Sequence, residues 1–300
     1  MCGRAAAAHF VAASQSHSGA WLNAVPATPD LRMTSDAFEL CVQRRLRAPI
    51  AALGGGRWSQ QLGRHVDTYG DALQNLHAHG ARHSKPLRKI VNMMRAVHGN
   101  TVRMEDAHHH IYSPGVRPDA THLRGARDGT HHRLVELKVT TPIAVGDEAT
   151  GALGGQVGFG NTAEHQYELI LGTDDKPGAY AGPLAAGHTV QPLIMEVLGG
   201  FHPDMVRYID GLARAHGARL GADELTAPWS ARSFRALHVQ RISVALQLAA
   251  AEEILDTIHP PRPICRRHAR RGHLLSPCPR VTEISCTCTC PMSELECRAS

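Results

Sequence analysis

Two acids and a lysine lie in this chain at a spacing that suits metal-dependent cleavage of a phosphodiester. Sixteen residues separate Pro118-Asp119 from the triplet Glu136-Leu137-Lys138. The carboxylates of Asp119 and Glu136, with the backbone carbonyl of Leu137, are hard oxygen ligands of the kind that Mg²⁺ or Mn²⁺ prefers. The ammonium group of Lys138 can orient or help to deprotonate the attacking water. An ordinary hairpin with a charged solvent face accounts for the same residue types.

A hairpin is expected to carry these residues. The segments 117–124 and 131–140 are strand-like, and Asp128-Gly129 lies between them. This dipeptide favours a two-residue type I′ turn, because both central positions need a positive φ. Side chains alternate between the two faces of a strand. The face expected to pack on a core consists of Val135, Leu137 and Val139.

The turn decides which residues share a face. Counting outward from a two-residue turn pairs Thr121 with Glu136 and Asp119 with Lys138. Directly opposed residues point the same way, so Asp119, Glu136 and Lys138 converge. A three-residue turn would change the parity and separate them. The predicted site therefore depends on the length of the turn.

Two helices are predicted ahead of the hairpin. The first lies within 34–50. Its expected apolar face consists of Phe38, Val42 and Leu46. The second begins at the cap Ser84, has Pro86 in its first turn and ends before Gly99. Its expected apolar face consists of Leu87, Ile90, Val91, Met94 and Val97.

The order of elements after the hairpin indicates an α/β fold. A helix is expected over 162–171, a strand over 189–200, a helix over 202–217 and a long helix over 230–258. Helices that alternate with strands in this way flank a central mixed sheet. From His259 onward, proline, arginine and cysteine replace the apolar periodicity, so the tail is expected to be disordered.

Composition sets broad limits on function. A chain of 300 residues with 43% apolar composition can bury one substantial core. Its net charge of +5 and its 21 histidines permit a polyanionic partner without demanding one. No apolar run approaches the roughly 18 residues of a membrane span, so no membrane partner is expected. Six of the eight cysteines lie in the last 36 residues, which favours a reducing compartment, nuclear or cytoplasmic, although no clear localisation signal is present.

Several further motifs occur in a fixed order around the site. They are SGAWLNAVP at 18–26, FELCVQRRLRAPI at 38–50, GRHVDTYGDAL at 63–73, ARHSKPLRKI at 81–90 and QPLIMEVLGG at 191–200. With RPDA and VELKV between them, residues 18–255 resemble the PD-(D/E)xK nucleases, which have a restriction-endonuclease-like fold. More particularly, they resemble the endonuclease region of non-LTR retrotransposons and reverse-transcriptase-related proteins.

The resemblance divides the chain into four parts. It implies an N-terminal linker or helical segment at 1–60, a degenerate zinc-knuckle-like region at 61–82, a restriction-endonuclease-like domain at 83–258 and a Cys/Arg/Pro-rich tail at 259–300. The region 61–82 contains no cysteine. The zinc site of the family, as usually built, is therefore lost, and zinc is not expected.

The resemblance also implies roles for single residues. Asp119 and Glu136 are then the metal-binding acids and Lys138 the catalytic lysine, with Mg²⁺ or Mn²⁺ as cofactor and DNA as substrate. Glu105 is a candidate accessory acid, for which a turn is the alternative. Gln166 is a candidate contact to the metal-bound water or phosphate, although packing and capping roles are favoured. A homodimer is compatible with this interpretation.

A basic surface before the site is the expected contact to DNA phosphates. Its candidate residues are Arg82, Lys85, Arg88, Lys89, Arg95 and Arg117. Solvated surface charge is an equally simple explanation for them. The leading hypothesis is a Mg²⁺-dependent DNA endonuclease derived from a retroelement. The alternatives are a catalytically inactive nucleic-acid-binding remnant of the same domain and a host interaction protein with no nucleic-acid role.

Overall fold

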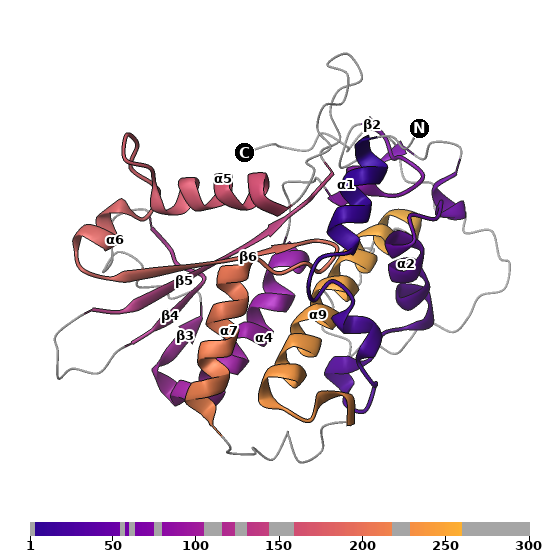
Figure 1. The fold of residues 1–300 in the computed structure, drawn as a ribbon. Coiled ribbons are helices and arrows are strands. Elements are labelled where there is room, and N and C mark those ends of the chain that lie inside the picture. Colours follow the sequence, from indigo (N-terminus) through magenta and orange to yellow (C-terminus); the bar gives the residue numbers. More distant parts are fainter. Residues whose placement is uncertain are drawn as a thin grey trace, which may run out of the picture. The chain divides into compact units, whose positions relative to one another are not determined.

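The computed structural model describes residues 4–54, 58–59, 64–74, 80–104, 116–123, 131–143, 159–217 and 229–259. The α-helices are α1 (Arg4–Ala13), α2 (Ser35–Arg45), α3 (Asp71–Gln74), α4 (Gly80–His98), α5 (Phe159–Leu171), α6 (Ala181–Ala185), α7 (Pro203–His216) and α9 (Phe234–Ile258) (Figure 1). The strands are β1 (Trp58–Ser59), β2 (Arg64–His65), β3 (Val102–Met104), β4 (Ala120–His122), β5 (Arg133–Thr140) and β6 (Thr189–Glu196). Short 3-10 helices are η1 (Ala20–Asn23), η2 (Pro29–Leu31), η3 (Ala51–Leu53), η4 (Gly99–Thr101) and η8 (Trp229–Ala231).

A four-stranded mixed sheet forms the centre of the fold. Its strand order is β3-β4-β5-β6, with antiparallel pairing from β3 to β5 and parallel pairing between β5 and β6. The parallel pair needs a crossover, and α5 and α6 lie in that connection. The predicted α/β class is confirmed, whereas β3 was not expected. β1 and β2 form a separate two-stranded ladder.

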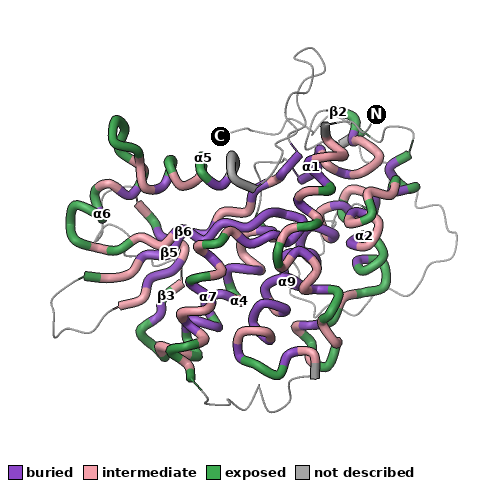
Figure 2. The backbone as a smooth tube through the Cα atoms, in the orientation of Figure 1, coloured by how far each residue is buried: buried purple, intermediate pink, exposed green. Residues whose placement is uncertain are grey.

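Helices cover both faces of the sheet (Figure 1). On one face, α4, α7 and α9 pack against Val135 and Leu137 of β5 and Leu193 and Met195 of β6. On the other, α5 and the residues before α6 pack against Leu134. Figure 2 shows the buried residues running along β5 and β6 and along α9. Of the charged side chains of β5, Glu136 is therefore buried, whereas Arg133 and Lys138 remain partly exposed.

The N-terminal segment is part of the same core. Trp21 and Leu40 are buried in one cluster with Leu237, Val244 and Ile254 of α9. Apolar side chains of the described residues before position 54 thus pack against α9. The tail that was expected to be disordered lies outside the described residues. None of the helices in the described part of the chain combines the length and apolar character that a bilayer crossing requires.

The position of α2 was predicted correctly, but its buried face was not. Thr34 caps the helix, since its Oγ1 accepts a hydrogen bond from the Ala37 N–H at 3.3 Å. Phe38 and Leu46 are exposed. The buried residues of the helix are Ala37, Leu40, Cys41 and Arg44. The small side chains of Ala37 and Cys41 permit close approach to α9, which periodicity counted over the larger residues did not reveal.

Helix α4 has the predicted apolar face and end but begins earlier. Leu87, Ile90, Val91 and Met94 are buried as expected. Gly99 follows the helix with a φ of +64°, as a C-terminal glycine does. The helix starts at Gly80, so Pro86 lies inside it. The additional turn carries Arg82, whose guanidinium donates to the Gln74 carbonyl at 2.5 Å and pairs with Glu253 at 2.6 Å.

Arg82 is therefore predicted to stabilise the fold. Its residue surface is 1% exposed. Arg82→Ala leaves the Glu253 carboxylate without its partner inside the protein, so we expect the free energy of unfolding to fall by about 3 to 5 kcal/mol. Urea denaturation measures this change. Arg88→Ala, at an exposed position on the same helix, is the control and should change the free energy by less than about 0.5 kcal/mol. Equal small effects of both substitutions would contradict the structural role.

Candidate active site

The hairpin register differs from the predicted one by two residues. Thr121 lies opposite Leu134 instead of Glu136, and Ala120 lies opposite Val135. Because the shift is even, every side chain stays on its predicted face. Continued outward by one residue, this register sets Asp119 level with Glu136. The Asp128-Gly129 turn lies outside the described residues.

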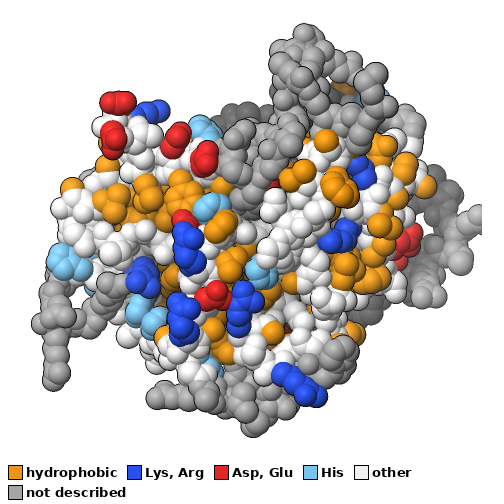
Figure 3. Space-filling view, viewed as in Figure 1, with side chains coloured by type: hydrophobic (Ala, Val, Ile, Leu, Met, Phe, Trp, Pro, Cys, Tyr) orange, Lys and Arg blue, Asp and Glu red, His pale blue; other side chains and the backbone are white. Residues whose placement is uncertain are grey.

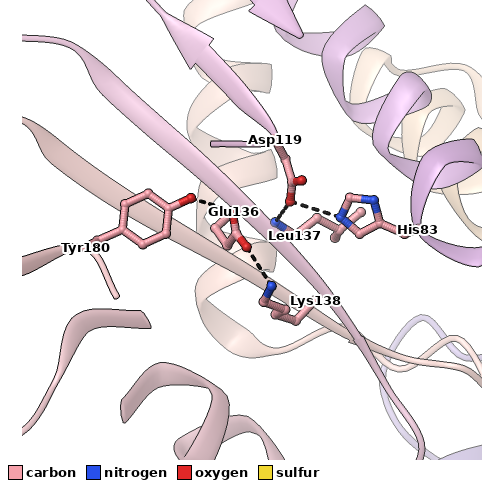
Figure 4. Close-up of polar contacts among 6 residues, drawn as sticks. All are labelled: His83, Asp119, Glu136, Leu137, Lys138 and Tyr180. Atoms are coloured by element: carbon pink, nitrogen blue, oxygen red, sulfur yellow. Dashed lines mark hydrogen bonds and ion pairs between the residues drawn. The ribbon is translucent and has the colours of Figure 1, made fainter. Parts of the chain in front are cut away.

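Asp119 lies immediately before β4 and holds the main chain of β5. Its Oδ2 accepts hydrogen bonds from the Leu137 N–H at 2.7 Å and from the His83 imidazole at 3.0 Å (Figure 4). The carboxylate thus occupies the position of a backbone acceptor where the β4 ladder ends. Burial by itself lowers the pKa of His83, but the hydrogen bond and charge of Asp119 outweigh it and raise that pKa. His83 is therefore poised to donate to Asp119.

Glu136 points to the other side of the Leu137 main chain. Its Oε1 accepts from the Lys138 ammonium at 2.6 Å and its Oε2 from the Tyr180 hydroxyl at 2.6 Å (Figure 4). Burial, together with the charge of Glu136, raises the pKa of Tyr180, which keeps the phenol protonated as a donor. Glu136 is only 8% exposed. A hairpin with a solvated charged face does not describe this arrangement.

The structure brings the three predicted residues to one place as two hydrogen-bonded groups. Asp119 belongs with His83, and Glu136 belongs with Tyr180 and Lys138. The Leu137 peptide lies between the groups and bonds to the first. Lys138 is the most accessible member, with 38% of its side chain exposed. Solvent can therefore reach the site from the Lys138 side.

Two residues of the site were not predicted. His83 lies in the ARHSKPLRKI motif, but only the packing of α4 beside β4 brings it to Asp119. Tyr180 lies between the expected helix at 162–171 and the expected strand at 189–200, and no spacing in the sequence relates it to Glu136. Tyr180 reaches Glu136 only through tertiary structure, because the crossover before β6 folds back over β5.

The two predicted accessory residues are Gln166 and Glu105. No hydrogen bond or ion pair in the described part of the chain joins Gln166, which lies on α5, to the site. Glu105 lies outside the described residues.

The predicted basic surface is only partly available. Arg82 is buried and cannot contact DNA, which corrects its assignment. Lys85 pairs with Glu252, and Lys89 pairs with Asp30 at 3.4 Å, so both are engaged within the protein. Arg88, Arg95 and Arg117 are exposed, and the Arg95 guanidinium also donates to the Val102 carbonyl at 3.3 Å. The surface is therefore smaller than its sequence suggested.

The donor set is chemically suited to Mg²⁺. Asp119, Glu136 and the Leu137 carbonyl are oxygen donors, and Mg²⁺ commonly takes one or two carboxylates and keeps several waters. In this structure, His83 and Lys138 supply the positive partners of the two acids. Within the described ranges, no group of three or more His, Cys, Asp or Glu side chains is arranged to hold a metal ion. A divalent ion would therefore rely on water and substrate for its other ligands.

Comparison of the chain with known protein families, with curated proteins and with solved structures finds no match. Function must therefore be inferred from the geometry of the site.

A third acid lies on the same face of the sheet. Glu196, opposite Thr140 at the end of β6, is 1% exposed. Neither of its carboxylate oxygens has a hydrogen-bond partner among the described residues. Burial raises the pKa of Glu196 to about 7. Periodicity could not reveal this acid, because QPLIMEVLGG has the pattern of a buried strand that contains a single acid.

Glu196 makes stability depend on pH. Its pKa rises from 4.5 to about 7 on folding, so the native state binds this proton more tightly. Stability is then highest below the unfolded pKa and falls as pH rises toward the folded pKa. Glu196→Gln removes this loss, so the variant should exceed the parent by about 3 kcal/mol at pH 8 and match it near pH 4.5. Urea denaturation at both pH values measures the difference. The exposed Asp175→Asn is the control, and a pH-independent effect of Glu196→Gln would contradict the assignment.

Proposed function

We propose that this chain is a metal-dependent endonuclease that hydrolyses DNA phosphodiesters. The observation that carries this proposal is the placement of Asp119 and Glu136 on either side of the Leu137 peptide, with the Lys138 ammonium 2.6 Å from Glu136. The hairpin followed by a crossover helix and a parallel strand is compatible with a restriction-endonuclease-like core. That fold is part of the proposal.

The residues of the site have three proposed roles: holding the metal ion, orienting the attacking water and fixing the carboxylates. Asp119, Glu136 and the Leu137 carbonyl would hold the ion, because a strand residue turns its N–H and C=O to the same side and the Leu137 N–H already faces Asp119. Bound Mg²⁺ would stabilise the negative charge that develops on the scissile phosphate. Lys138, the accessible group, orients the attacking water or contacts the phosphate. His83 and Tyr180 fix the orientations of the two carboxylates.

A second candidate function is nucleic-acid binding without cleavage. The contacts of Glu136 favour it, because Lys138 and Tyr180 together engage both carboxylate oxygens. An ion would have to replace one of these hydrogen bonds. If losing that hydrogen bond costs more free energy than binding the ion provides, the site binds no metal. The domain would then bind nucleic acid only through its charged surface.

Nicking of supercoiled plasmid by the full chain with Mg²⁺ or Mn²⁺ tests the leading proposal. Asp119→Asn and Lys138→Met should each lower the rate at least about 100-fold, because one removes a ligand and the other the ammonium beside it. Asp175→Asn, in an exposed segment, should nick like the parent. A folded chain that leaves the plasmid intact, or active-site variants that nick like the parent, would overturn the nuclease. Salt-sensitive DNA binding would then favour the second candidate, and no binding at low salt would favour neither.

The role of Tyr180 can be tested separately. Tyr180→Phe removes the hydrogen bond to Glu136 Oε2 and leaves the ring in place. A ligand that has lost its supporting hydrogen bond binds metal less tightly, so the Mg²⁺ concentration for half-maximal nicking should rise about 10-fold. Tyr69→Phe, whose ring stacks under Arg47 away from the site, should need the same Mg²⁺ concentration as the parent. An unchanged Mg²⁺ requirement in Tyr180→Phe would exclude the positioning role.

A further inference from the structure

The outer edge of β6 is covered along only half of its length. Near the C-terminal end, the Ile194 carbonyl accepts from the His202 N–H at 2.9 Å, and the Glu196 N–H donates to the Gly200 carbonyl at 2.8 Å. The preceding half, from Val190 to Pro192, borders a groove between α5 and α7. This groove has a volume of about 550 Å³. It is large enough to hold several ligand groups.

The main chain of this open edge is poorly suited to an added strand. The Thr189 N–H donates to the His132 carbonyl at 2.9 Å, so Thr189 faces β5. Main-chain groups alternate sides along a strand, and Val190 and Pro192 therefore face the groove. Pro192 has no N–H to donate, and a proline on an edge opposes pairing with another strand. An extended peptide that pairs with β6 is accordingly disfavoured.

The charge of the groove is positive. Arg133 and Arg207 line it with His98, and Asp204 is the only acid among the described residues that line it. Arg207 pairs with Asp204. Arg133 lies over the Tyr208 ring at 5.9 Å and forms no ion pair in the described part of the chain. Figure 3 shows Lys and Arg side chains gathered over α7 and beside β6, which complements an anion.

Gly211 leaves one wall of the groove open. It lies within α7, where glycine is less favourable than alanine. A Cβ atom added at Gly211 would meet no atom of the described residues within 4 Å. Packing against the described part of the chain therefore gives no reason for glycine here. A ligand that approaches the backbone of α7 would give one.

We propose that this groove binds a single nucleic-acid strand, with a phosphate on Arg133 and its bases against the apolar wall that includes Tyr167 and Leu171. A positive groove with an aromatic side chain is the usual arrangement for an unpaired strand. The inference rests on the proposed function and specifies its substrate class. Pro192 is the register partner of Glu136, so the groove lies one strand away from the candidate active site. It would hold a part of the substrate that is not cleaved.

Binding of a fluorescein-labelled 20-nucleotide oligothymidylate to the full chain, measured by anisotropy in EDTA, tests the groove. Arg133→Gln should weaken binding about 10-fold and reduce the slope of log K against log salt by about 1. Gly211→Met fills the groove from its open wall and should weaken binding about 10-fold as well. Thermal unfolding checks that each variant is folded. Gly211→Ala places a smaller side chain at the same position in the groove. Arg32→Gln, exposed and beside η2, is the control and should bind like the parent.

The outcomes separate the groove from the nuclease. EDTA removes divalent metal, so binding does not require cleavage, and the exposed Asp175→Asn should bind like the parent. Loss of binding in the groove variants supports the groove even if no plasmid is nicked. The groove is overturned if the parent does not bind the oligonucleotide, or if Arg133→Gln and Gly211→Met bind like the parent. Displacement of the oligonucleotide by polyglutamate at equal charge concentration would also overturn it, in favour of an acidic polypeptide.

Discussion

Helix α9 is the element on which the rest of the fold depends. Its 25 residues include 16 that are buried, so the helix is surrounded instead of lying on a surface. Leu246 belongs to the core cluster that supports the sheet, whereas Ala251 and Ile254 belong to the cluster that holds the N-terminal segment. Glu253 of the same helix pairs with Arg82 at the start of α4. The position of α4 beside the site is thus set from α9, and one long apolar helix links two separate cores.

The candidate active site follows from where β4 stops. A longer strand would pair its backbone with Leu137, but here the Asp119 carboxylate accepts the Leu137 N–H instead. The Asp119 carboxylate, in the place of a backbone carbonyl, brings a charged group into the sheet at the level of Glu136. Both acids are largely covered, so each needs donors to offset the loss of water. His83 from α4 and Tyr180 from the crossover provide them, which ties the two faces of the sheet to the same site.

The sequence could predict those features that depend on local pattern. Parity along the hairpin is one of them, because an even error in register leaves Glu136 and Lys138 on their predicted face. The apolar face and glycine end of α4 are another. The buried face of α2 and the interior position of Arg82 could not be predicted. The buried face of α2 depends on small side chains that pack closely against α9. The buried position of Arg82 depends on its ion pair with Glu253, more than 150 positions away in the sequence.

Glu136 and Glu196 show why burial alone does not identify a functional acid. Both lie on the face of the sheet covered by the crossover, and both are less than a tenth exposed. Glu136 accepts from an ammonium and a phenol, whereas Glu196 has no partner among the described residues and its pKa is raised to about 7 by burial. A carboxylate that already accepts from an ammonium group is suited to a cation. If a metal ion took the place of the Lys138 ammonium beside Glu136, the neighbouring charge would stay positive. An acid without donors is instead prepared to take up a proton. The partners of each carboxylate, more than its depth, therefore determine its chemistry.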